Sequence, residues 1–242
     1  MKKVWKVWID GGHGGKDSGA TGNGLQEKDI VLDLSVKIKK RLEAEYEGVE
    51  AILTRNTDVF VELNDRTNRV NAAGADVLVS IHCNASGGSG GFESFRYTSA
   101  SAATKAFQNV LHTEIMAQLK PFNVIDRGQK AANLHMCRES KMPAVLTENL
   151  FVDVPSDAYK LKQANVIDAI VTGHVVGIAK YLGLKKKGVG QPAKVTVLVN
   201  GKQVNNAKLE DGTVMVPLRA VSEALGANVT WDNSTKTATI TK

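Results

Sequence analysis

The sequence of 242 residues has little of what marks several common protein classes. It has only two cysteines, Cys83 and Cys137, and their spacing suits neither a disulfide framework nor a cysteine-based zinc knuckle. It also has no apolar run near the roughly 20 residues that a membrane-spanning helix needs. A hydrophobic content of 43% with 23% charged residues predicts a folded globular protein instead.

Positive charge is in excess by a formal +6, but it is unevenly distributed. Residues 1–182 carry 22 basic and 21 acidic side chains, and residues 195–242 carry five and four, whereas residues 183–194 carry four basic and none acidic. A nucleic-acid-binding surface would combine basic and aromatic residues on a folded element. The charge therefore predicts a solvated linker around Lys185–Lys187 and no nucleic-acid partner, with attraction to a polyanionic surface as the alternative.

Short runs that are apolar on both faces alternate with helical spacing of apolar residues in the first 182 residues. Such runs are typical of central strands in a parallel sheet covered on both sides. Strands that alternate with helices predict βαβ units, so we expect an α/β domain with a mostly parallel twisted sheet flanked by helices on both faces. The expected strands are Val7–Ile9, Asp76–Ile81 and Pro143–Thr147, and the expected helices are 26–45, 101–119 and 156–182.

A second module is expected after the linker at residues 183–194. The Asn200-Gly201 dipeptide between two apolar runs indicates a hairpin. A short helix over Leu218–Leu225 and a second hairpin around Asp232–Thr235 complete the pattern. We therefore expect a small α+β domain at residues 195–242, separate from the domain at residues 1–182.

Four polar residues fall at one edge of the expected sheet. His13 follows the first strand, His82 ends the second and Glu148 ends the third, while Glu27 lies in the first turn of the helix after the first strand. They should converge, because the carboxyl ends of parallel strands and the starts of the following helices meet at one edge. Any one of them alone could equally be a structural residue.

Taken together, these residues predict a catalytic zinc site. Two imidazoles and one carboxylate, here His13, Glu27 and His82, are a common ligand set for one zinc ion that leaves a fourth position for water. Glu148 could then carry the proton, and Asp10 could orient His13. The remaining histidines predict less. His112 and His174 lie on expected helices and are expected to be surface or packing residues, and His135 could share a face with Cys137.

Five segments follow one another in an order that resembles the motifs of a known family, the zinc-dependent N-acetylmuramoyl-L-alanine amidases of the amidase 3 type. The segments are Val7–Ala20, Gln26–Asp29, Leu53–Arg55, Ser80–Ala85 and Pro143–Glu148. The resemblance covers about residues 4–182 and implies a phosphorylase/hydrolase-like fold. It implies Zn²⁺ held by His13, Glu27 and His82 and a catalytic Glu148. Residues that would support the site or bind substrate are Asp10, Arg66, Asn84 and Arg127.

The resemblance also implies the reaction, which is hydrolysis of the amide between N-acetylmuramic acid and the L-alanine of the stem peptide of peptidoglycan. Gly11 replaces a usual proline and Asn149-Leu150 replaces a common glycine, so substrate preference could differ. Two alternatives remain open: a zinc peptidase that cuts within the stem peptide, and a non-catalytic protein that binds the cell wall.

Residues 195–242 resemble the small domain called copper amine oxidase N-terminal-like. They contain no histidine or cysteine, so we expect no copper site. Their expected role is cell-wall targeting, with stabilisation or dimerisation as the alternative. Lys6 interrupts the short apolar run Val4–Ile9, which makes it a poor secretory signal. We therefore expect a monomer that is made in the cytoplasm and reaches peptidoglycan after the membrane is breached, as a phage or prophage endolysin or a mother-cell lytic enzyme does.

Overall fold

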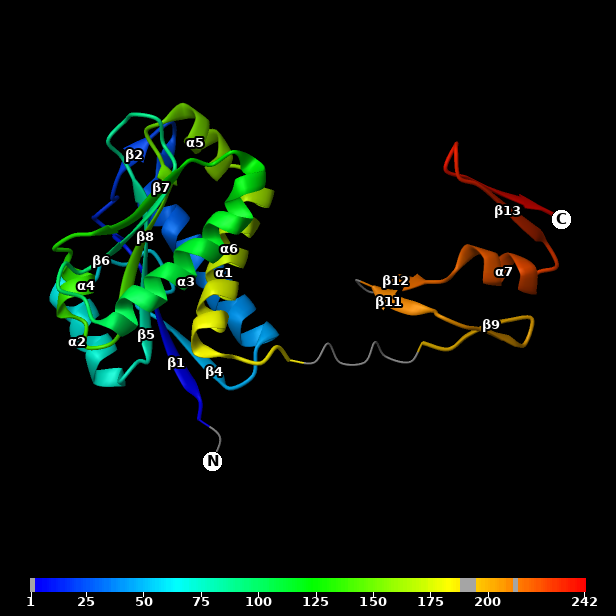
Figure 1. Ribbon diagram of the computed structural model, residues 1–242, viewed down its shortest axis with the longest axis horizontal. Coiled ribbons are helices and arrows are strands. Elements are labelled where there is room, and N and C mark those ends of the chain that lie inside the picture. The colour runs from blue at the N-terminus through cyan, green and yellow to red at the C-terminus, as the bar shows by residue number, and fades with distance from the viewer. Residues whose placement is uncertain (1–2, 188–194, 211–212) are drawn as a thin grey trace. The chain divides into compact units, whose positions relative to one another are not determined.

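The computed structural model describes residues 3–187, 195–210 and 213–242. The chain divides into two compact units, Met1–Lys186 and Lys187–Lys242 (Figure 1). Residues 184–186 belong to the first unit, where the amide of Glu47 donates to the carbonyl of Lys185 and Lys186 forms a bridge with Tyr46. The first unit thus extends slightly into the segment expected to be a linker.

A six-stranded sheet forms the centre of the first unit, in the order β4-β1-β5-β8-β6-β7. The first four strands in this order are parallel, whereas β6 is antiparallel to β8 and parallel to β7. The mostly parallel sheet is therefore confirmed, and β6 and β7 reverse its direction at one edge. The strands are β1 (Trp5–Gly11), β4 (Val49–Leu53), β5 (Val77–Asn84), β6 (Phe92–Arg96), β7 (Asp126–Ala131) and β8 (Ala144–Phe151).

Helices cover the two faces of this sheet unequally. The long helices α1 (Glu27–Glu45), α3 (Ala102–Leu119) and α6 (Ala164–Leu182) pack on one face, and the shorter α2 (Leu63–Ala73) and α4 (His135–Glu139) on the other (Figure 1). The single helix expected at residues 156–182 is two helices, since α5 (Pro155–Leu161) ends before α6 begins. The break lies at Gln163, whose extended backbone starts α6 by accepting from the amides of Val166 and Ile167. The smaller elements are β2 (Thr21–Gly22), β3 (Leu25–Gln26) and the 3₁₀ turn Lys120–Phe122.

Alternation along the strands separates the main core from the functional edge. In β5 the side chains of Val79, Ile81 and Cys83 join the core under the three long helices. The intervening His82 points to the opposite face, because successive side chains of a strand alternate. Cys83, the neighbour of His82 in this strand, therefore faces away from the candidate site.

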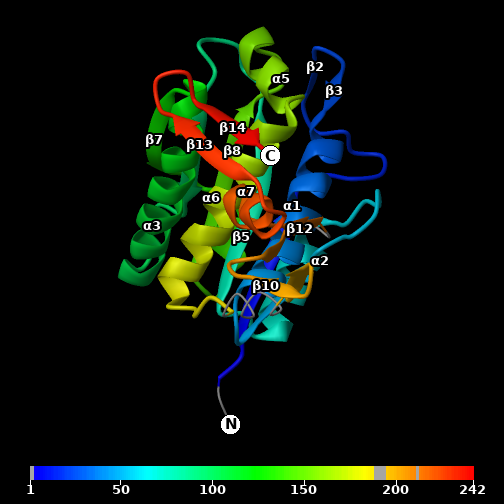
Figure 2. The same ribbon diagram turned by 90° about the vertical axis from the view of Figure 1, so that its right-hand side faces the viewer.

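The described residues of the second unit form three antiparallel strand pairs and one helix (Figure 2). Two of the hairpins, at Asn200-Gly201 and at residues 233–236, match the turns expected from the sequence, and the third was not expected. None of the helices in the described part of the chain is long and apolar enough to cross a membrane. The elements are β9 (Val197–Val199), β10 (Lys202–Val204), β11 (Lys208–Glu210), β12 (Thr213–Met215), α7 (Leu218–Ala224), β13 (Asn228–Asp232) and β14 (Thr237–Thr241).

Candidate active site

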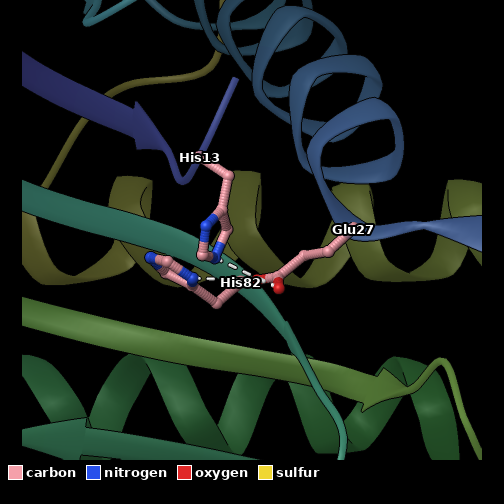
Figure 3. Close-up of side chains that lie close together, drawn as sticks. All are labelled: His13, Glu27 and His82. Atoms are coloured by element: carbon pink, nitrogen blue, oxygen red, sulfur yellow. Dashed lines mark hydrogen bonds and ion pairs between the residues drawn. The ribbon is translucent and has the colours of Figure 1, made fainter. Parts of the chain in front are cut away.

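Three of the expected site residues point toward one another from three separate elements (Figure 3). His13 lies in the turn after β1, Glu27 is the first residue of α1, and His82 lies in β5. Nε2 of His13 is 3.1 Å from Oε2 of Glu27, and Nδ1 of His82 is 2.9 Å from Oε1 of the same carboxylate. One potential ligand atom from each residue lies within 4.8 Å of the other two.

This cluster of His13, Glu27 and His82 fits a zinc ion. Tetrahedral ligand atoms at the usual zinc distances lie about 3.3 Å from one another. The two distances from the imidazoles to the carboxylate of Glu27, 3.1 and 2.9 Å, are close to this value. Burial raises the pKa of Glu27, but hydrogen bonds from both imidazoles outweigh it and hold the pKa well below its ordinary value. The hydrogen bond to Glu27 raises the pKa of His13 to about 9, so binding of a metal cation would displace a proton from this ring.

Backbone amides hold Glu27, and a second carboxylate holds His13. The carboxylate of Glu27 accepts hydrogen bonds from the amides of Ala20 and Cys83, at 2.8 and 3.0 Å. Nδ1 of His13 lies 2.9 Å from Oδ2 of Asp17, which leaves Nε2 directed at Glu27. The rings are therefore oriented before any ligand binds, and Asp17 is a site residue that the sequence did not indicate.

Asp10 does not hold the ring of His13, contrary to expectation. Its two carboxylate oxygens accept from Nη1 of Arg66, at 2.9 Å, and from Oγ of Ser80, at 2.8 Å. Arg66 in turn donates through Nη2 to the backbone carbonyl of His13, at 2.6 Å. Asp10 and Arg66 thus support the backbone of the loop, while Asp17 supports the imidazole. The expectation about Asp10 fails because its side chain on β1 contacts Arg66 and Ser80. His13 lies beyond the end of the strand, where its ring contacts Asp17.

Glu148 lies beside the three-residue cluster. Its residue on β8 is the register partner of His82 on β5, so both side chains point to the same face. Oε2 of Glu148 is buried and has no hydrogen-bond partner among the described residues. Burial raises the pKa of Glu148 to about 7, against an ordinary value of 4.5. A carboxyl group with this pKa can both take and give a proton near neutral pH.

The structure adds another carboxylate that sequence reasoning missed. Glu93 on β6 is the register partner of Glu148 and is buried. It accepts from Nδ2 of Asn84 at 2.7 Å and from Nε of Arg127 at 2.9 Å, and it pairs with Lys130. Asn84 and Arg127 therefore meet at Glu93. The local sequence offers only an acidic residue between two phenylalanines, Phe92 and Phe95.

The other histidines lie outside this cluster. His135 Nε2 is 3.3 Å from Oγ1 of Thr67, and Sγ of Cys137 is 3.7 Å from the carbonyl of Phe95. His135 and Cys137 form no common site because they lie two residues apart on a helix and point in different directions.

His112 and His174 are packing residues, as expected. His112 is buried between Ser94 and Asp126, in a chain of hydrogen bonds that resembles a hydrolase triad. Ser94 is 0% exposed, so no substrate can reach its hydroxyl. His174 is also buried and bonds to Thr147 and to the carbonyl of Ile170.

A cavity of about 280 Å³ opens next to the cluster. His13 and His82 line one side, and Phe60, Leu63 and Met136 contribute apolar surface. The site thus has an apolar side toward α2 and a charged side toward β6 and β7.

Comparisons with known proteins match both units. Residues 7–180 match the N-acetylmuramoyl-L-alanine amidase family, and residues 198–242 match the copper amine oxidase N-terminal domain. The endolysin of Bacillus phage SPP1 is 51% identical over 190 residues, which cover 78% of this chain and 70% of the relative. A sporulation-specific N-acetylmuramoyl-L-alanine amidase of Bacillus subtilis is 46% identical, covering 79% of this chain and 74% of the relative.

Solved structures are similar over the same region. The catalytic domain of the N-acetylmuramoyl-L-alanine amidase CwlV from Bacillus (Paenibacillus) polymyxa is 35% identical with a TM-score of 0.70, covering 75% of this chain and 100% of that chain. An N-acetylmuramoyl-L-alanine amidase from Clostridium difficile 630 is 32% identical with a TM-score of 0.72, covering 75% and 98%. Sequence, fold and the order of the motifs agree, and the chain belongs to the N-acetylmuramoyl-L-alanine amidase family.

Proposed function

We propose that this chain hydrolyses the amide between N-acetylmuramic acid and L-alanine in peptidoglycan. In this proposal a zinc ion is held by His13, Glu27 and His82, and Glu148 moves the proton. Family membership supports the reaction. The observation that carries the assignment of roles is the pairing of His82 with Glu148 on adjacent strands. A carboxyl oxygen of Glu148, which has no partner in the described part of the chain, thus lies beside the cluster of proposed ligands.

The division of labour follows from the protonation states of these groups. Zinc, when bound, supplies a Lewis acid that acidifies water and stabilises negative charge on a carbonyl oxygen. Glu148 takes the proton from the attacking water and delivers it to the nitrogen that leaves with the stem peptide. A pKa of about 7 suits both steps, because the group gives up and regains a proton at little cost near that pH.

Replacing Glu148 tests the assignment. Glu148→Gln keeps the shape of the side chain but cannot carry the proton, so we expect turnover to fall by roughly 10²–10⁴-fold. Bound zinc, measured by elemental analysis, should stay at one ion per chain. Glu139→Gln, an exposed carboxylate paired with Arg138, is the matched control and should retain activity. Retained lysis by Glu148→Gln would show that another group is the base.

The products decide between the amidase and its alternatives. Purified peptidoglycan should be incubated with the zinc-loaded protein, with and without a chelator, and the fragments analysed by mass spectrometry. We expect free lactyl carboxylates on muramic acid and intact stem peptides beginning with alanine. New termini within the stem would support a zinc peptidase, and no cleavage at all would support a wall-binding protein.

We further propose that the second unit directs a monomeric enzyme to the cell wall. The similarity to a phage endolysin and to a sporulation-specific amidase supports a lytic role of one of these kinds. Binding of the full chain to purified walls should be compared with that of a chain ending at Lys186. Unchanged binding would contradict targeting by the second unit, and sedimentation would test the monomer. Release from the cytoplasm after membrane breach stays a prediction.

A further inference from the structure

A row of side chains crosses the sheet at the candidate active site. His82, Glu148 and Glu93 are successive register partners on β5, β8 and β6, so their side chains point to the same face. β7 follows β6 in the sheet and contributes Arg127 and Lys130, which both contact Glu93. The row therefore runs from a metal ligand, through the proposed proton carrier, to a pair of cations.

The cations are held in place by Glu93, which is only 3% exposed. Arg127 reaches Glu93 through Nε, at 2.9 Å, and its guanidinium lies 4.7 Å over the ring of Phe151. Asn84 donates to the other oxygen of the same carboxylate, at 2.7 Å. The side chains of Arg127 and Lys130 remain 28% and 39% exposed, so a ligand can reach both.

Glu93 has more positively charged partners than are needed to neutralise its charge. One cation would balance its single negative charge, but two are present. A guanidinium has five N–H donors, and Arg127 engages Glu93 through only one of its nitrogens. Nη1 of Arg127 also donates to the carbonyl of Gly90, at 3.4 Å. The other Nη donors suit a second anion, because charge-assisted hydrogen bonds to a carboxylate are strong.

The proposed reaction indicates which end of this row faces the peptide that leaves. Glu148 must lie near the nitrogen that leaves, because it delivers a proton to that atom. Glu148 is displaced from His82 toward β6, so the peptide attached to this nitrogen extends toward β6 and β7. The muramic acid then lies on the opposite side, next to the cavity lined by Leu63 and Met136.

We infer that Arg127 and Lys130 bind a carboxylate of the stem peptide and that Glu93 is the residue that positions them. A stem peptide that is not cross-linked through its C-terminus carries a carboxylate there. The inference rests on the proposed amidase function and adds to it a subsite for an acidic peptide on the leaving side of the amide.

Two soluble substrates that differ in one charge test this subsite. Both are muramoyl peptides whose stem has a single carboxyl group, which is free in one substrate and converted to an amide in the other, and neither contains phosphate. With the zinc-loaded full chain we expect a KM roughly tenfold lower for the acid than for the amide, as expected for one charge-assisted contact. Arg127→Gln and the more exposed Lys130→Gln should each bring this KM ratio close to one. Arg127→Lys should restore part of it, because the charge is kept.

Two further variants separate the parts of the inference. Lys105→Gln, an exposed lysine on α3, should keep the wild-type ratio. Glu93→Gln increases the local positive charge but removes the anchor, so KM for the acid should rise. A lower KM for the acid in Glu93→Gln would overturn the positioning role.

The failure of this inference differs from that of the proposed function. If the wild-type chain cleaves neither substrate, the amidase proposal fails and the subsite fails with it. If it cleaves both with equal KM, only the carboxylate subsite is overturned. Arg127 and Lys130 variants that keep the wild-type ratio would overturn it as well.

Discussion

Nδ1 of His13 and Oδ2 of Asp17 lie 2.9 Å apart across a tight loop. The other oxygen of Asp17 accepts from the amide of Gly19, at 3.0 Å, so the carboxylate is itself fixed. A carboxylate that holds the second nitrogen of a ligand histidine sets the tautomer and orientation of the ring. Asp17 therefore orients a proposed zinc ligand without being one of the proposed ligands itself.

Asp17→Asn should weaken zinc binding by roughly 10–100-fold, because an amide can hold the ring in the wrong tautomer and lacks the negative charge. Competition with a chromophoric chelator measures this affinity directly. Asp33→Asn, which removes a carboxylate from an exposed pair with Lys37, is the matched control. Equal zinc affinity in the two variants would contradict the role of Asp17.

Gly12→Ala should displace a proposed zinc ligand. A Cβ atom at Gly12 would lie 2.2 Å from Cε1 of His82, a distance that requires the ring to move. We expect zinc affinity to fall at least tenfold while the circular dichroism spectrum stays unchanged. Gly24→Ala is the control, because its Cβ meets no atom within 4 Å although its φ of +76° adds strain. Normal zinc content in Gly12→Ala would show that the ring can shift without loss of binding.

Acid should destabilise the first unit through His174. Burial lowers the pKa of this histidine to about 4 in the folded chain, whereas the ordinary value is 6.5. Between these values the unfolded chain binds the proton and the folded chain does not, so the stabilisation is complete above pH 6.5 and is lost as the pH falls toward 4. The loss should approach about 3 kcal/mol.

Urea unfolding in the presence of a chelator, at pH 4 to 7.5, measures this effect as the difference between the wild-type chain and His174→Gln. The advantage of the wild type should shrink toward pH 4. His135→Gln, at a partly exposed ring, provides a comparison for removal of a histidine as such. A difference for His174 that does not change with pH would refute the assignment.

Gly173→Ala should destabilise the packing of α6 on α3. Its Cβ would lie 2.5 Å from Cα of Ile115, so the two helices must separate, at a cost of about 1–3 kcal/mol. Gly177→Ala is the graded comparison, because its Cβ would lie 3.0 Å from Cα of Leu111. We expect a clearly lower Tm for Gly173→Ala than for Gly177→Ala. The reverse order would mean that the better helix propensity of alanine outweighs the contact.

The central half of the sheet could be predicted from the sequence, and its edges could not. β1, β5 and β8 are apolar on both faces, so their composition alone marks them as buried strands. By contrast, β7 has the sequence Asp126-Arg-Gly-Gln-Lys-Ala131 and is a strand only because it pairs with β6. The antiparallel direction of β6 depends on the path of the chain after β5. No local sequence pattern indicates this path.

The candidate site shows the same division. His13, His82 and Glu148 follow from the rule that polar residues at carboxyl strand ends gather at one edge. Asp17 and Glu93 do not follow from it, because a loop bond and an antiparallel strand bring them in. The prediction that Asp10 orients His13 was wrong. The position of a residue at a strand end shows where it lies along the sheet, but it does not show which side chain it contacts.

The unequal covering of the sheet has a consequence for a substrate that is a solid. Three long helices cover one face of the sheet, whereas only short helices cover the other. The edge that carries His82, Glu148 and Arg127 is therefore less covered. A cross-linked cell wall cannot diffuse into a closed cavity. The enzyme therefore has to bring its catalytic residues to the wall. His82, Glu148 and Arg127 are each only partly exposed at this edge, so a polymer has to bring its amide to them from one side of the sheet.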